Sequence, residues 1–142
     1  MYDRILVPTD GSETATRAVD HAVDLAATYG ATLHVLSVVD PTRFSTVDVD
    51  PSSVLEAVEK SSRDAVEAVE TTAADAGVAV ETTVVRGAPA RTITEYATDN
   101  DIDLVVMGTH GRTGLDRYLL GSVTERVVRT APVPVLTVRL DE

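Results

Sequence analysis

The sequence predicts an α/β fold in which one parallel sheet carries helices on both faces. Short apolar runs rich in β-branched residues alternate along the chain with longer segments whose apolar residues recur at three- and four-residue spacing. This alternation is typical of strand–helix–strand units, which build parallel sheets. The run at 103–107 is nearly all apolar, as expected for a central strand that is buried on both faces.

The chain opens with a predicted strand, a helix and a second strand. The first strand covers residues 4–8 and ends at a proline. Ser12 can cap the helix that follows, because its hydroxyl oxygen can accept a backbone N–H of the first turn. Gly30 is a suitable stop for that helix, and the β-branched run at 32–39 predicts the second strand.

A loop at 40–50, containing Pro41 and several acidic residues, leads to the longest predicted helix. That helix covers 51–76 and ends at Gly77. Its apolar face is expected to comprise Val54, Val58, Ala65, Val69 and Ala76.

The second half of the chain repeats the strand–helix pattern to its end. The predicted elements are a strand at 78–85, a helix at 89–98, a strand at 103–107, a helix at 122–130 and a strand at 133–138. With 142 residues, the whole chain, 1–142, is expected to be one domain.

Composition excludes several classes of function. The chain has no cysteine, so disulfides and thiolate metal sites are excluded. Acidic residues number 23 and basic residues 12, and the net charge of −11 disfavours nucleic acid and anionic membranes as partners. No apolar run is long enough to span a membrane, and no leader is visible after Met1, so a cytoplasmic location is expected.

The near absence of lysine indicates a halophilic protein. An acidic protein from a GC-rich genome is the alternative explanation.

The first candidate site follows the first strand, at Pro8, Thr9 and Asp10. Ligands of open α/β sheets bind beyond the carboxyl ends of the strands. A short carboxylate at such an end suits a ribose hydroxyl or a metal that bridges phosphates. The alternative is that Asp10 only shapes the turn before the helix.

The second candidate site follows the fourth strand, where Gly108, Gly111 and Gly114 lie within seven residues. Glycines let backbone amides face a phosphate without obstruction by a Cβ atom. Gly121 and Ser122 open a predicted helix, whose free N–H groups can bind an anion. Segment 108–130 carries four arginines and two acidic residues, so an acidic chain is locally positive here. A flexible loop with an ordinary cap is the alternative.

Several enzyme classes do not fit the sequence. A P-loop needs a Gly-Lys pair, whereas the only lysine, Lys60, lies in a predicted helix. The GxGxxG dinucleotide pattern and the GxSxG nucleophile elbow are both absent. Of the three histidines only His110 lies in the candidate site, and His21 and His34 are expected to be surface or packing residues. A histidine zinc cluster is therefore not expected.

The spacing Gly108-x2-Gly111-x9-Gly121-Ser122 resembles the G-x2-G-x9-G-(S/T) motif of the ATP-binding branch of the universal stress protein family. The segments 5–12 and 133–138 also resemble that family's first strand and loop and its last strand, so the resemblance covers essentially the whole chain. It implies a Rossmann-like sheet of five parallel strands in the order 3-2-1-4-5. It also implies a homodimer through antiparallel contact of the last strand.

By the same resemblance, ATP would lie across the ends of the first and fourth strands with Mg²⁺ or Mn²⁺, and Asp10 would lie near the ribose or the metal. The residues implied as nucleotide contacts are Pro8, Thr9, Asp10, Val38, Met107, Gly108, Gly111, Gly121, Ser122, Val123 and Thr124. No catalytic residue is implied. The expected function is a dimeric, ATP-binding stress-response regulator that acts as a nucleotide-dependent switch or sensor on an unknown downstream protein. The alternatives are a slow ATPase, with His110 or Asp116 as the base, and a constitutive interaction module that does not use nucleotide.

Overall fold

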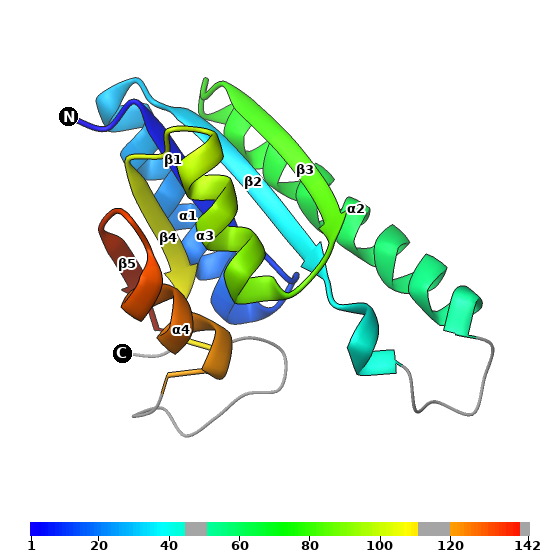
Figure 1. Ribbon diagram of the computed structural model, residues 1–142. Coiled ribbons are helices and arrows are strands. Elements are labelled where there is room, and N and C mark those ends of the chain that lie inside the picture. Colours follow the sequence, from blue (N-terminus) through cyan, green and yellow to red (C-terminus); the bar gives the residue numbers. More distant parts are fainter. Residues whose placement is uncertain (45–50, 111–119, 140–142) are drawn as a thin grey trace.

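The computed structural model describes residues 1–44, 51–110 and 120–139, which form a central sheet flanked by helices (Figure 1). In chain order the elements are β1 (Arg4–Pro8), α1 (Glu13–Tyr29), β2 (Thr32–Val39), the short 3₁₀ helix η1 (Pro41–Phe44), α2 (Pro51–Asp75), β3 (Val80–Arg86), α3 (Pro89–Asp99), β4 (Leu104–Gly108), α4 (Ser122–Thr130) and β5 (Val135–Val138). The predicted alternation of strands and helices is confirmed.

The five strands form one parallel sheet in the order β3-β2-β1-β4-β5, as the family resemblance implied. The chain moves outward from β1 to β3 on one side and then returns to place β4 against the other edge of β1. The strand order therefore reverses between β1 and β4, which is where open α/β sheets bind ligands.

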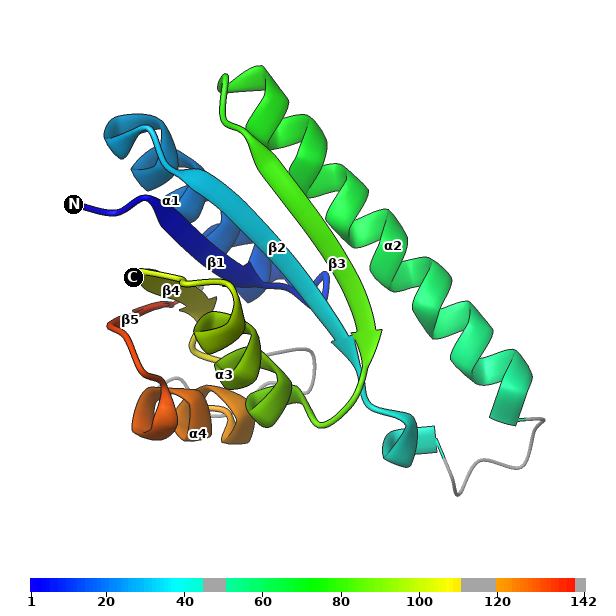
Figure 2. The same ribbon diagram turned by 45° about the horizontal axis from the view of Figure 1, so that its top comes forward.

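The side chains of the sheet alternate between two apolar layers. Ile5 and Val7 of β1 face a cluster with α1 and α2, whereas Leu6 faces a second cluster with α3 and α4. Figure 2 shows α2 running beside β3, with its first turns extending beyond the carboxyl end of that strand. None of the described helices is long and apolar enough to cross a membrane.

Helix α1 begins and ends where its sequence predicts. The Ser12 side chain accepts a hydrogen bond from the backbone N–H of Ala15 at 3.2 Å. Gly30 ends the helix with φ of 67°, a left-handed conformation that favours glycine. The start of α1 is thereby fixed directly after the loop that carries Asp10.

Several elements differ from their predicted bounds, mostly by one residue, and β3 begins at Val80 rather than at residue 78. Strand β5 begins at Val135 rather than at residue 133, because Pro132 and Pro134 lack the N–H groups that a ladder needs. The predicted loop at 40–50 begins with the 3₁₀ helix η1, and residues 45–50 lie outside the described part of the chain.

The buried stripe of α2 also differs from the predicted face. Val69 is buried as expected, but Ala76 is exposed, and Val66 and Ala73 are buried in its place. Ala76 lies beyond the end of the helix at Asp75, so the helical spacing no longer applies to it.

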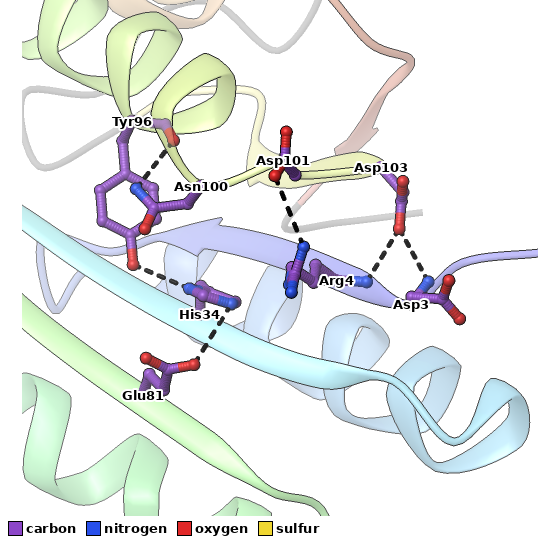
Figure 3. A network of polar contacts seen from close by, with 8 residues as sticks. All are labelled: Asp3, Arg4, His34, Glu81, Tyr96, Asn100, Asp101 and Asp103. Atoms are coloured by element: carbon purple, nitrogen blue, oxygen red, sulfur yellow. Dashed lines mark hydrogen bonds and ion pairs between the residues drawn. The ribbon is translucent and has the colours of Figure 1, made fainter.

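A buried polar cluster lies between the sheet and α3 (Figure 3). His34 of β2 is only 3% exposed, and its Nδ1 lies 2.8 Å from the hydroxyl oxygen of Tyr96. Its Nε2 has no hydrogen-bond partner among the described residues and lies 3.7 Å from a carboxylate oxygen of Glu81 on β3. His34 is thus a packing residue, as the sequence predicted.

Burial lowers the pKa of His34 below its ordinary value of 6.5, more strongly than Glu81 raises it. The folded chain therefore holds His34 neutral at a pH where the unfolded chain binds a proton. We expect the free energy of unfolding to fall as the pH drops through 6.5, with a slope of at most about 1.4 kcal/mol per pH unit from this one group. Urea unfolding between pH 7.5 and pH 5 measures the slope.

The matched control for this prediction is the exposed His21. His34→Gln should flatten the slope, and His21→Gln should leave it as in the wild type. Equal slopes for all three proteins would show that the buried histidine does not carry the pH dependence.

Candidate functional site

A cavity of about 260 Å³ opens at the carboxyl ends of β1, β2 and β4, beside the first turn of α4. Ten of the eleven residues named as nucleotide contacts line it: Pro8, Thr9, Asp10, Val38, Met107, Gly108, Gly121, Ser122, Val123 and Thr124. The eleventh, Gly111, lies outside the described residues, as do Gly114, Arg112 and Arg117. The fold thus brings together residues that are far apart in the sequence.

Part of the cavity wall comes from helices that the sequence did not assign to the site. Val58 and Ser62 of α2 line one side, and Pro89 and Ile93 of α3 line another. The helical spacing placed Val58 only on an apolar face. Val58 and Ser62 lie in the amino-terminal half of α2 (Pro51–Asp75), and the packing of this helix on the sheet brings them to the cavity. No local pattern in the sequence predicts that packing.

The first turn of α4 presents at the cavity backbone donors that no hydrogen bond within the helix uses. Gly121 is the N-cap and makes no side-chain cap bond, and the first intrahelical bond runs from the N–H of Glu125 to the carbonyl of Gly121 at 2.9 Å. The N–H groups of the preceding residues 122–124 therefore have no carbonyl of α4 to bond. All three of these residues line the cavity, an arrangement that suits an anion.

Thr124 connects α4 to the end of β4. Its side chain is buried, and its hydroxyl donates to the carbonyl of Gly108 at 2.8 Å. The hydroxyl proton is thus committed, so Ser122 is the residue of this turn whose hydroxyl can donate to a ligand. The family resemblance implied both residues as nucleotide contacts without separating these roles.

Two glycines of the motif lie in tight surroundings, and Gly108 in particular leaves no room for a side chain. A Cβ atom on Gly108 would meet the Cγ2 atom of Thr14 at 2.6 Å and the backbone of Thr14 at 3.1 Å. A Cβ atom on Gly121 would meet the Cα atom of His110 at 3.1 Å. A side chain at position 121 would therefore require a small shift of His110.

The loop after β1 is shaped by its own side chains. The Oδ1 atom of Asp10 accepts a hydrogen bond from the N–H of Ser12 at 3.0 Å, and the Thr9 hydroxyl oxygen accepts one from the N–H of Gly11 at 3.1 Å. Asp10 thus shapes the turn and lines the cavity at the same time. Among the described residues, no group of three or more His, Cys, Asp or Glu residues could hold a metal ion.

Val38 of β2 lines the cavity, and its backbone N–H and C=O both point toward the β1 side of the strand. Along β2, Thr32 bonds to Asp3 and Leu36 bonds to Thr9, whereas Leu33 and Val39 bond toward β3. Even-numbered residues therefore direct N–H and C=O toward β1. Strand β1 ends at Pro8, opposite Leu36, so Val38 presents a donor and an acceptor beyond the end of its neighbour.

The comparisons with known proteins all lead to the same family. The model of the Universal stress protein family matches residues 1–139. Universal stress protein MJ0531 from Methanocaldococcus jannaschii is 39% identical over 141 residues, which covers 98% of this chain and 83% of the relative.

Solved structures agree with this similarity. The chain resembles the structure of protein MJ0577 with a TM-score of 0.88 and 32% identity, covering 100% of this chain and 99% of the other. MJ0577 is a universal stress protein of the same archaeon. A universal stress protein in complex with cAMP aligns with a TM-score of 0.75 and 29% identity over 99% of both chains.

Proposed function

Because this chain belongs to the universal stress protein family, we propose that it is an ATP-binding stress-response regulator whose nucleotide state changes its contacts with a downstream protein. The observation that carries the proposal is the cavity where the ends of β1, β2 and β4 meet the start of α4. A related universal stress protein binds cAMP, so an adenine nucleotide is the chemical class that the relatives support.

The cavity offers a suitable group for each part of ATP. The N–H and C=O of Val38 complement the N1 acceptor and the N6 donor on the edge of adenine. The N–H groups at the start of α4 and the hydroxyl of Ser122 complement the phosphates. Asp10 would hold the ribose or contribute to Mg²⁺ or Mn²⁺, which would take its remaining ligands from phosphate and water, as Mg²⁺ commonly does.

Replacing Ser122 with alanine tests the phosphate end of the site. We expect Ser122→Ala to weaken ATP binding about tenfold or more, because a hydrogen bond to a charged group contributes roughly 1.5–3 kcal/mol. Calorimetric titration of nucleotide-free protein measures the affinity. Ser61→Ala is the matched control, since Ser61 is exposed on α2 and does not line the cavity. Equal affinities for the two variants would remove Ser122 from the site.

Two observations bear on the alternative functions. His110 lines the cavity and is the described candidate for the base of a slow ATPase, while Asp116 lies outside the described residues. The packing around Gly108 favours the constitutive interaction module, because packing alone would explain that glycine. Binding of ATP separates that module from the proposed regulator.

The proposed homodimer would form through β5. This strand lies at the edge of the sheet, and Leu136 on it is 39% exposed. Exposed apolar edges favour pairing with another chain. Leu136→Asp should shift sedimentation of the wild-type dimer toward the 15.1 kDa monomer, and a wild type that sediments only as a monomer at micromolar concentration contradicts the dimer. Val135 of the same strand packs against the core. A substitution there would also disturb the fold, so Leu136 is the better position for this test.

A further inference from the structure

A second cavity, of about 280 Å³, lies between the first turn of α3 and one side of α4. These helices cover the same face of the sheet (Figures 1 and 2). Its lining shares Asp40, Pro89, Ser122 and Val123 with the cavity described above. The two cavities therefore adjoin at these four residues, two of which, Ser122 and Val123, lie at the start of α4 where the phosphates are proposed to bind.

Three arginines line the second cavity, and they differ in how they are paired. Arg129 forms an ion pair with Glu125 at 2.5 Å, and Arg91 forms one with Glu95 at 3.5 Å. Arg126 forms no ion pair within the described part of the chain.

The position of Arg126 relates it directly to Ser122. The two residues are four apart on α4, so their side chains lie on the same side of the helix, one turn apart. Asp40 and Glu125 are the acidic residues of this cavity, and Glu125 is already neutralised by Arg129. An anion that extends from Ser122 toward α3 would therefore meet the positive charge of Arg126 in a protein whose net charge is −11.

We propose that Arg126 is a specificity-determining residue that binds the terminal phosphate of a nucleoside triphosphate in the second cavity. The inference rests on the proposed function, because it takes the first phosphate to lie at the start of α4. The single phosphate of AMP ends in the first cavity. The two further phosphates of ATP lengthen the anion and carry it to Arg126, so the second cavity selects ATP over AMP.

The experiment is calorimetric titration of the nucleotide-free full chain with ATP and with AMP. For Arg126→Gln we expect about a tenfold loss of ATP affinity, typical of a lost charge-assisted hydrogen bond, and a change of less than about twofold for AMP. Arg126→Lys keeps the charge and should recover part of the loss. Arg4→Gln is the control, because it removes the same charge from an exposed position at the amino end of β1, the opposite end of the sheet.

The outcomes separate this inference from the proposed function. If the wild type binds ATP and AMP but Arg126→Gln binds both as the wild type does, the second cavity has no role and the proposed function stands. Equal losses for ATP and AMP would mean that Arg126 acts through general charge and would overturn its role in specificity. If the folded wild type binds neither nucleotide, both proposals fail together.

Discussion

ATP is expected to bind this chain at least about 30-fold more tightly than GTP, from the penalty of two mismatched buried polar groups. The reason is the backbone of Val38, whose N–H and C=O are directed past the end of β1. Adenine offers an acceptor at N1 and a donor at N6, which match this pair. Guanine offers a donor at N1 and an acceptor at O6, which oppose it. Each buried polar group left unpaired costs about 1–3 kcal/mol, so two of them cost about 2–6 kcal/mol.

Changes in the ligand test this prediction more cleanly than changes in the protein, because a side-chain substitution leaves the backbone of Val38 in place. ITP carries the same hydrogen-bonding edge as guanine but lacks the 2-amino group, so it should bind as weakly as GTP. Purine riboside triphosphate lacks the N6 donor and keeps N1, so it should lie between ATP and GTP. Equal affinities for ATP and GTP would exclude recognition of the adenine edge by Val38.

Replacing Gly108 with valine is expected to destabilise the fold itself. Gly108 is the buried last residue of β4, and its Cβ position lies 2.6 Å from Thr14 Cγ2 and 3.1 Å from the backbone of α1. Overpacking of a well-packed interior costs typically 1–3 kcal/mol, and the backbone contact places Gly108→Val at the upper end of that range or beyond it. Gly108→Ala should lose less. Urea unfolding followed by circular dichroism measures both losses.

A double-mutant cycle identifies the contact responsible. Thr14→Ser removes the methyl group nearest to the new side chain, so it should recover part of the stability lost in Gly108→Ala. The expected coupling between the two positions is about 0.5–3 kcal/mol, as for residues in direct contact. Additive losses would show that Thr14 is not what requires a glycine at this position.

Local patterns in the sequence predicted the fold well because each pattern has a local physical cause. Ser12 and Gly30 fix the ends of α1 through a cap bond and a left-handed turn. The strand order was available only through the family resemblance, since apolar runs do not state which strands pair. The start of β5 was placed two residues too early, because its apolar pattern continues through positions where proline interrupts the ladder.

The candidate site was predicted where its residues share a loop or a motif. The glycine spacing and the loop at Asp10 identified two walls of the cavity. The wall from α2, formed by Val58 and Ser62, depends on how that helix packs on the sheet. The contact of Gly108 with Thr14 depends on the packing of α1 against β4. Both are tertiary relations, and no short segment of the chain contains them.

The central claim is that the cavity at the ends of β1, β2 and β4 binds ATP. Titration of nucleotide-free wild-type protein with ATP and Mg²⁺ in a calorimeter tests it most directly, with circular dichroism confirming that the chain is folded. The account predicts saturable binding of one ATP per chain. A folded protein that binds no ATP at millimolar concentration would contradict the account and leave the interaction module as the better interpretation of this fold.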